Sequence, residues 1–303
     1  MAMTTATAAQ ADTMFVSEGG GNKITEVTST GTKITVGSAL DFPWALGFDS
    51  AGNLYEADFN SGNVYKFAKD GSSFLPKTTF ASGITNVWGL TFDNLGNLFV
   101  STRDYSDAKI YKFANRDGVL SSTKTTFASG LTYAQDLAVD SQNNLYASIG
   151  ASQGSIYKYT PSGVQSTFAT NLSNVTGIIF DSAGNLWESN YGTNEILKFT
   201  SAGVKSTFAS LSTCNGLAFN SDGDLLAIQR GYGVGAGSIL EYANTGGTLS
   251  TSPTTVVSGL NGPTYIINQQ SGGGSAVPLP AAAWSGLVLL SGLGLNRLRR
   301  QMA

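Results

Sequence analysis

The side chains best able to do chemistry in this sequence lie in short segments beside predicted strands, where aromatic rings alternate with amides and charged groups. Rings that stack and polar groups that hydrogen-bond together suit a saccharide or a peptide. The alternative is that Trp44 and Trp88 only fill interior space, because aromatic residues in loops often pack. The candidate ligand-binding residues are Trp44, Asp58, Trp88, Arg103, Tyr105, Gln135, Tyr191, Asn215 and Arg230, and the same segments also contain Phe59, Tyr133 and Tyr232.

Covalent and metal-dependent catalysis find little support in these residue types. The chain contains no histidine, which removes Ser-His-Asp triads, a histidine base for a cysteine nucleophile, and histidine-based metal sites. The single cysteine, Cys214, cannot form an intramolecular disulfide and is predicted to be a buried apolar thiol. We therefore predict no catalytic residue, no metal site and no cofactor.

Two glutamates stand at an unusual position. Glu56 and Glu188 occupy the third position of a predicted strand, where sibling segments carry Val100, Ala147 and Ala227. Two carboxyl groups that face each other can act as general acid and base. The two strands are expected to lie far apart, so we expect each glutamate to pair locally, with a lysine or with backbone N–H groups.

The composition describes a protein with a real core and an uncharged polar surface. Hydrophobic residues make up 41% of the 303 residues, and charged residues make up 12%, against about 25% in an average soluble domain. The net charge is −3, and no basic block precedes Arg297. The chain thus lacks the cationic surface that binding to nucleic-acid phosphates requires.

A repeat runs through residues 14–268. Four stretches, one of which is LGFDSAGNLYEADFNSGNVYKFAKDG, align almost without gaps, and a fifth is looser. Regular spacing of this kind indicates a repeat architecture. The residues that open the repeated turn are Asp49, Asp93, Asp140, Asp181 and Asn220, spaced by 44, 47, 41 and 39 residues.

Each repeat is predicted to be a four-stranded antiparallel sheet. The aspartate that opens the turn can accept backbone N–H bonds, and the glycine can adopt the positive φ that closes a hairpin. Short apolar-alternating strands without helical periodicity indicate an all-β fold. In one repeat the predicted parts are a strand Gly89–Phe92, a turn Asp93–Asn97, a strand from Leu98, a strand Lys109–Phe113, a turn at Asp117-Gly118 and a strand Thr125–Ala128.

The two ends of the repeat region complete the count. Residues 14–36 match the later strands of a repeat but lack its first strand, and residues 264–268 match a first strand alone. Five complete repeats plus these halves make six, which predicts an all-β, six-bladed β-propeller closed by pairing of its N- and C-terminal strands. An open β-solenoid is the alternative, but it does not explain complementary half-repeats.

The repeated pattern F-D-x-x-G-N-L-[YFW]-x-[AS] resembles NHL-type repeats. It is also similar to the wider propeller superfamily that includes gluconolactonase-like proteins and virginiamycin B lyase. This resemblance covers residues 14–268. It implies the propeller scaffold, on which lactonases, lyases and binding modules all occur.

The enzymes of this superfamily imply site residues that can be checked position by position. The gluconolactonase-like members hold a divalent metal with acidic and Asn ligands just before the first strands. Asn215 matches one such ligand, and Asp136 is shifted by one position. The lyases rely on a histidine that this chain lacks. The remaining repeats carry Trp44, Trp88, Thr176 and Pro263 at the ligand position, which is too few oxygen ligands for a hard cation.

The C-terminal segment differs from the rest of the chain. Residues 269–276 have the composition of a flexible linker, and residues 277–303 contain an apolar run, 281–296, that ends beside Arg297, Arg299 and Arg300. A helix of that length is just short of the hydrocarbon core of a bilayer, and flanking arginines can extend it. We predict a transmembrane helix with the arginines in the cytoplasm and the repeat region outside.

The order of Pro motif, apolar helix and Arg cluster resembles the PEP-CTERM sorting signal in its VPLPAAAW variant. The resemblance implies processing by an exosortase, often in bacteria that produce exopolysaccharide. Leu279 stands where glutamate is commoner. The matching residues are Val277, Pro278, Leu279, Pro280, Trp284, Arg297, Arg299 and Arg300.

The N-terminal residues 1–13 read either as a disordered start or as the end of a signal peptide. Ala9-Gln10-Ala11 fits a small-x-small cleavage site, although no basic or apolar stretch precedes it within the chain.

From the resemblance of the C-terminal segment to a sorting signal, we expect an exported protein of a Gram-negative-type bacterium that passes through the inner membrane to the cell surface or extracellular matrix. The expected role is non-catalytic binding or structure, with exopolysaccharide or other envelope components as partners. The alternative is an extracellular lactonase or lyase.

Overall fold

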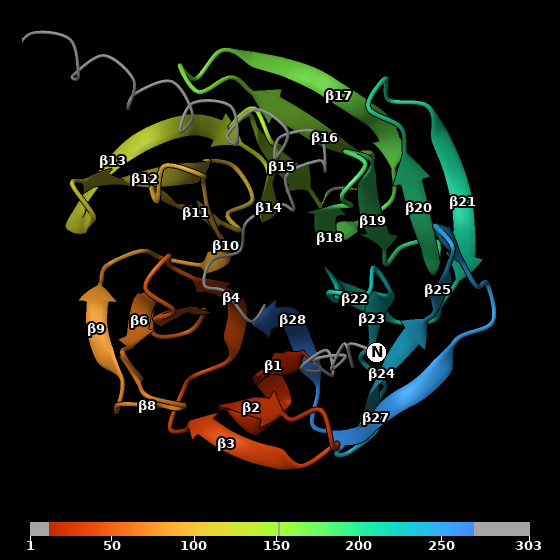
Figure 1. Ribbon diagram of the computed structural model, residues 1–303. Helices are drawn as coiled ribbons and strands as arrows, with labels where there is room; N and C mark the ends of the chain where they lie inside the picture. Colours follow the sequence, from red (N-terminus) through yellow and green to blue (C-terminus); the bar gives the residue numbers. More distant parts are fainter. Residues whose placement is uncertain (1–11, 151, 270–303) are drawn as a thin grey trace, which may run out of the picture.

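The computed structural model describes residues 12–150 and 152–269, which form a ring of six four-stranded antiparallel sheets (Figure 1). The predicted all-β, six-bladed propeller is confirmed, and the only helix in the described residues is a short 3-10 turn, η1 (Gly19–Gly21). The predicted transmembrane helix 281–296, the linker and the sorting motif lie outside the described residues. Among the described residues, no helix is long and apolar enough to cross a bilayer.

Three blades are built from strands that follow one another directly in the chain. Each blade is named here by its innermost strand. The β10 blade contains β10 (Val87–Phe92), β11 (Leu98–Thr102), β12 (Ala108–Arg116) and β13 (Val119–Leu131); the β14 blade contains β14 (Ala134–Val139), β15 (Leu145–Ile149), β16 (Gly154–Tyr159) and β17 (Gln165–Leu172); the β18 blade contains β18 (Val175–Phe180), β19 (Leu186–Asn190), β20 (Glu195–Phe199) and β21 (Lys205–Ser210).

Two further blades carry a small extra hairpin that the repeat pattern did not predict, between their third and fourth strands. The β4 blade contains β4 (Pro43–Phe48), β5 (Leu54–Asp58), β6 (Asn63–Phe67) and β9 (Thr78–Ala81), with the hairpin β7 (Lys69–Asp70) and β8 (Ser73–Phe74); the β22 blade contains β22 (Cys214–Phe219), β23 (Leu225–Gln229), β24 (Gly237–Tyr242) and β27 (Thr254–Leu260), with the hairpin β25 (Asn244–Thr245) and β26 (Thr248–Leu249).

The sixth blade joins the two ends of the described chain. Its order is β28 (Pro263–Gln269), β1 (Thr13–Glu18), β2 (Lys23–Val27) and β3 (Lys33–Gly37). In the register of β1 and β28, Phe15 lies opposite Ile267 and Val16 lies opposite Ile266. The predicted pairing of residues 14–17 with residues 264–267 is confirmed, which excludes the open solenoid because the first and last described strands belong to one blade and close the ring.

The repeated turn has the structure that its sequence predicts. Asp93 Oδ1 accepts the backbone N–H groups of Leu95 and Asn97 at 3.0 and 2.8 Å, and Asn97 Nδ2 donates to Asp93 Oδ2 at 2.7 Å. Gly96 adopts φ +77°, which a side chain would oppose. Equivalent carboxylate bonds hold the turns at Asp49, Asp140 and Asp181.

Serines in the second strands connect neighbouring blades. Ser101 accepts the N–H of Gly89 within its own blade and donates its hydroxyl to the carbonyl of Gln135 in the next blade. Ser189 makes the same link to the carbonyl of Asn215. Each of these hydroxyls is fully buried, so the positions of adjacent inner strands are set by satisfied hydrogen bonds as well as by apolar packing.

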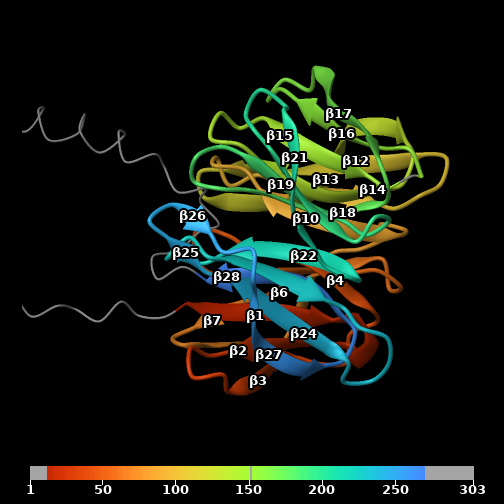
Figure 2. The same cartoon turned by 90° about the vertical axis from the view of Figure 1, so that its right-hand side faces the viewer.

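The strand directions divide the connections between two faces of the ring. We call the face with the connections that precede each inner strand, and with those between second and third strands, the loop face. The turn face carries the repeated aspartate turns and the two extra hairpins. In the side view, β25 and β26 project from the turn face at the left edge of the molecule (Figure 2).

Three buried residues test expectations about the interior. Cys214 is fully buried in an apolar cluster, as predicted, and burial raises the pKa of its thiol. Glu56 and Glu188 lie in blades on opposite sides of the ring and are fully buried. In the described part of the chain neither glutamate forms an ion pair or a well-formed hydrogen bond, so the expected local pairing is not found there, and only a weak contact with the backbone of Trp44 favours the charged form of Glu56. Burial raises the pKa of both, that of Glu188 to about 8.

Candidate functional site

The residue directly before each inner strand adopts a left-handed conformation in all six blades. A positive φ is uncommon for a residue other than glycine, and it is strained for a bulky one. Backbone strain at this repeated position is therefore confined to the blades that carry Phe42, Tyr133 and Thr213, since asparagine and glycine adopt a positive φ readily. The residues are Phe42 (φ 64°), Asn86 (56°), Tyr133 (50°), Asn174 (55°), Thr213 (53°) and Gly262 (57°).

A second repeated position lies against the first. The residue that follows each second strand donates its backbone N–H to the carbonyl of the left-handed residue in five blades. The donors are Phe59, Arg103, Gly150, Tyr191 and Arg230, at 2.8 to 3.2 Å. Arg103 and Arg230 are thus equivalent in the repeat. Their blades, β10 and β22, lie on opposite sides of the ring, because β14 and β18 separate them on one side and β4 and β28 on the other.

Two tryptophans fill the space between the inner strands at the loop face. The rings of Trp44 and Trp88 have centroids 3.6 Å apart, and each residue is only 5% exposed. Phe42 stacks on Trp44 at 5.7 Å, and Phe59 meets Trp88 edge-on at 5.2 Å. Trp44 and Trp88 therefore pack in the interior, as the alternative in the sequence analysis expected. We call this pair the tryptophan plug.

The two arginines lie on the two outer sides of the tryptophan plug. The guanidinium carbon of Arg103 is 4.5 Å from the ring centroid of Trp88 and 5.2 Å from that of Tyr133. The guanidinium of Arg230 is 5.7 Å from Trp44. A continuous arginine–tryptophan row results, in the order Arg230, Trp44, Trp88, Arg103, held by cation–π attraction.

The charges of the arginine–tryptophan row are not neutralised within the described part of the chain. Neither Arg103 nor Arg230 forms an ion pair there, and Arg103 Nε is buried without a hydrogen-bond partner. Burial lowers the pKa of Arg103. Guanidinium groups that are partly removed from water and lack an ion-pair partner bind a carboxylate or a set of hydroxyl oxygens more strongly than fully hydrated guanidinium groups do.

Exposed tyrosines flank the row at each end. Tyr105 is 71% exposed and meets Tyr133 edge-on at 5.4 Å beside Arg103. At the other end, the Tyr232 hydroxyl beside Tyr191 raises the pKa of Tyr191, and Arg230 lies close to both. The structure thus brings Trp44, Trp88, Arg103, Tyr105, Tyr191 and Arg230 into one surface, with Phe42, Phe59, Tyr133 and Tyr232.

Three candidate residues lie beneath this surface rather than on it. Asp58 is fully buried, and its carboxylate accepts the N–H groups of Asp41 at 2.7 Å and Ser61 at 3.2 Å, so it holds loops together. Gln135 is buried and donates to Asn174 Oδ1 at 3.3 Å. Asn215 is buried as well. Phe42 was missed by sequence analysis, although its place directly before Pro43 at the start of an inner strand marks it as part of the repeated position.

The residues at the expected metal position do not fit a divalent cation. Asp136 is buried, and its oxygens accept the N–H groups of Leu137 at 2.9 Å and Ile178 at 2.8 Å. Burial raises the pKa of Asp136 to about 7, so much of it is neutral at physiological pH. Within residues 12–150 and 152–269, no three acidic, His or Cys side chains gather. Asn215 alone is an inadequate ligand set for a hard cation.

Comparisons with known proteins agree on the fold and go no further. No family model matches the chain, and no curated protein matches it. Many solved structures are similar at low identity, which shows the propeller fold alone. They include the PQQ-bound aldose sugar dehydrogenase of Streptomyces coelicolor, at 16% identity with a TM-score of 0.61, which covers 77% of this chain and 87% of the other.

Two other similar structures belong to the groups that the repeat pattern resembles. Virginiamycin B lyase of Staphylococcus aureus, in a complex with quinupristin, is 15% identical with a TM-score of 0.57, covering 82% of this chain and 85% of the lyase. A candidate gluconolactonase is 15% identical with a TM-score of 0.53, covering 73% of this chain and 92% of its own. The likeness to these propellers supports the scaffold that the repeats predicted.

Proposed function

We propose that this protein is an exported β-propeller that binds an acidic extracellular polysaccharide on its loop face without transforming it. The arginine–tryptophan row carries this proposal. Two guanidinium groups that have no carboxylate partner within the described residues lie at opposite sides of two buried indole rings, and exposed tyrosines flank them. Saccharide rings can stack on exposed aromatic faces such as those of Tyr105 and Tyr232, and guanidinium groups bind carboxylates in a bidentate manner.

The geometry favours binding over the alternative of a lactonase or lyase. The loop face is filled by the tryptophan plug where a propeller enzyme would need converging acid, base or metal ligands. The only carboxyl at the expected ligand position, Asp136, is engaged with two backbone amides. A surface with charged donors and exposed tyrosines can hold a polymer, and this proposal assigns those groups to binding rather than to proton transfer.

Export rests on the resemblance of residues 277–303 to the PEP-CTERM signal. In this proposal an exosortase at the inner membrane processes the tail near Val277–Pro280, and the propeller then reaches the cell surface or the matrix. The described chain ends at Gln269, which pairs with Thr13 in the β1–β28 pair at the turn face.

The Arg103→Ala, Arg230→Ala double variant is expected to bind polygalacturonate at least tenfold more weakly than the natural chain. Loss of both charges removes the carboxylate contacts while the tryptophan plug stays packed. Binding is measured by calorimetry at several salt concentrations, since the natural interaction should weaken with salt.

The control removes a cation of the turn face. Lys69→Ala, on the exposed strand β7, should leave polygalacturonate binding unchanged. Neutral dextran should bind the natural protein more weakly than polygalacturonate does. Equal binding of polygalacturonate by the natural and double-variant proteins would show that the loop face is not the site.

Replacing Arg297, Arg299 and Arg300 by serine is expected to disturb membrane retention and sorting while the propeller remains folded. The apolar run is just short of the hydrocarbon core of a bilayer, so its flanking arginines are expected to determine its position and orientation. Fractionation and mass spectrometry of protein from its own host measure the outcome. The mature natural chain should end near Val277–Pro280. Mature protein that keeps Gln301-Met302-Ala303 and remains in the cytoplasm would refute export.

A further inference from the structure

A cavity of about 900 Å³ opens on the turn face, on the side of the ring opposite the proposed polysaccharide site. We call it the axial cavity, because every inner strand contributes an apolar wall residue. These are Leu46, Leu90, Leu137, Ile178, Leu217 and Ile266. Its volume lies in the range of cavities that enclose a small molecule.

The axial cavity is separate from the arginine–tryptophan row. Trp44, Trp88, Arg103 and Arg230 do not line it. Tyr265, which does line it, also packs against the cluster that contains the tryptophan plug. The plug therefore forms a partition between the two faces, and a ligand of the cavity would not meet the loop face.

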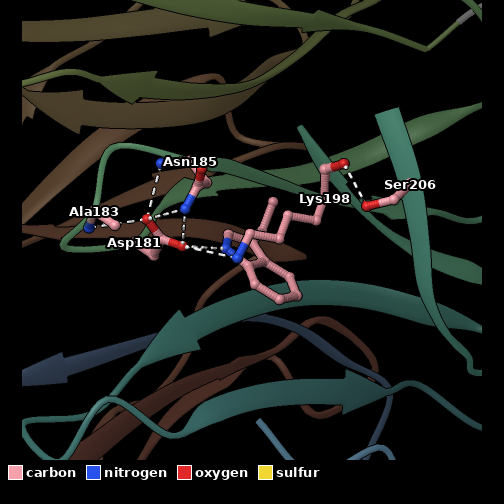
Figure 3. A network of polar contacts seen from close by, with 6 residues as sticks. Asp181, Ala183, Asn185, Lys198 and Ser206 are labelled. Atoms are coloured by element: carbon pink, nitrogen blue, oxygen red, sulfur yellow. Dashed lines mark hydrogen bonds and ion pairs between the residues drawn. The ribbon is translucent and has the colours of Figure 1, made fainter. Parts of the chain in front are cut away.

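A side arm extends the axial cavity outward between the β18 and β22 blades, and its charged residues already have partners. Asp181 accepts hydrogen bonds from Ala183 N–H at 3.0 Å, Asn185 Nδ2 at 2.8 Å and Trp187 Nε1 at 2.9 Å (Figure 3). Lys198 lies 3.7 Å from the same carboxylate. Because these are the only charged residues that line the cavity in the described chain, a charged ligand would find no free counter-charge.

One buried polar atom in the wall has no partner in the described part of the chain. Asn268 lines the axial cavity and is only 9% exposed. Its Nδ2 donates to the carbonyl of Phe219 at 2.8 Å, which sets its orientation, and its Oδ1 has no hydrogen bond. A buried acceptor left unsatisfied costs free energy that a donor on a ligand would recover.

We propose that the axial cavity binds a neutral amphipathic small molecule. Its apolar body lies among the aliphatic residues of the six inner strands, and a single hydroxyl or N–H donor bonds to Asn268 Oδ1. This binding is independent of the loop face and does not depend on the polysaccharide proposal.

The test uses the full chain and the neutral dye N-phenyl-1-naphthylamine, which has an apolar body and one N–H donor. Saturable binding, seen as enhanced dye fluorescence, is expected. Thr91→Phe, at a half-buried cavity position on β10, should weaken binding at least tenfold by filling space. Thr167→Phe, on the exposed outer strand β17, is the matched control and should bind as the natural chain does. Absent binding, or equal binding by both variants, would overturn the proposal.

A second comparison isolates the hydrogen bond to Asn268. The N-methylated dye lacks the donor, and it should bind the natural chain about two- to tenfold more weakly than the parent dye, the range expected for one hydrogen bond. In Asn268→Leu the two dyes should bind equally, which is a result that general destabilisation does not produce. The same loss on methylation in both proteins would overturn the role of Asn268.

The tail of this chain is the competing occupant, since it follows Gln269 in the sequence and the preceding residue, Asn268, lines the axial cavity. A Leu289→Asp, Leu290→Asp variant makes the tail polar and leaves every cavity residue unchanged. Equal dye binding by this variant and by the natural chain supports a small-molecule site. Binding by the variant alone would assign the cavity to the tail and overturn the proposal.

Discussion

A chain ended at Gly262, just before β28, is expected to show no cooperative unfolding transition. The β28 strand is the innermost strand of its blade, and it also contacts β22 and β4 of the neighbouring blades. Its removal deletes the buried Ile266, opens the ring and exposes apolar side chains that packed against it, such as Val16 on β1 and Ala218 on β22. Each buried aliphatic side chain contributes about 1.5–3 kcal/mol, so the loss of several such contacts removes a large part of the roughly 5–15 kcal/mol by which a native domain is stable.

Circular dichroism and urea unfolding measure this result, and a chain ended at Gln269 is the control. That control keeps β28 with the hydroxyl of Thr264 bonded to the carbonyl of Pro43 at 2.9 Å, so it should unfold cooperatively. The N–H of Asn261 bonds to Glu18 Oε2 at 2.5 Å and is present in both chains, so the comparison isolates the strand itself. Cooperative unfolding of the shorter chain would show that β28 closure is dispensable.

The Glu188→Gln variant is expected to be more stable than the natural protein by an amount that grows with pH. Burial raises the pKa of Glu188 from 4.5 to about 8, with Lys205 too weak to offset it. Below about pH 4.5 the side chain is protonated in both the folded and the unfolded state, so the variant gains little. Between about pH 4.5 and 8 the unfolded state ionises first, and the natural protein loses stability that glutamine retains.

The difference between the two free energies of unfolding should level off above about pH 8, at up to about 5 kcal/mol. Urea unfolding at pH 4, 6 and 8.5 measures it. Asp70→Asn removes an exposed carboxylate from strand β7 and should change stability only slightly at each pH. A Glu188→Gln difference that stayed constant from pH 4 to pH 8.5 would contradict a raised pKa in the folded state.

The loop face shows how a repeat can generate a specific surface. Phe59, Gly150 and Tyr191 occupy the same place in their blades as Arg103 and Arg230, and all five make the same backbone bond. The backbone role is therefore independent of the side chain. Side chains at this position can therefore vary without loss of the backbone bond, which leaves them available for binding.

The turns and the blade count could be predicted from sequence because they depend on local chemistry and on period. The carboxylate of Asp93 needs only the amides of the next four residues, and Gly96 needs only its own φ. The segments at the two ends of the repeat region each match a different part of one repeat. The β1–β28 pairing could therefore be predicted from the number of complete and partial repeats. Burial of Cys214 followed from its apolar strand and the absence of a partner thiol.

Only the tertiary structure decided how the side chains of different blades meet. Arg103 and Arg230 are 127 residues apart in the chain, and they share a surface because the inner strands converge and place two indole rings in contact between them. Asp58 and Arg103 look alike in the sequence as polar residues beside strands. In the described structure, however, the carboxylate of Asp58 accepts hydrogen bonds from nearby backbone amides, whereas Nε of Arg103 has no hydrogen-bond partner. The axial cavity and the unpaired Glu188 arise in the same way, because burial depends on what other blades place opposite a residue.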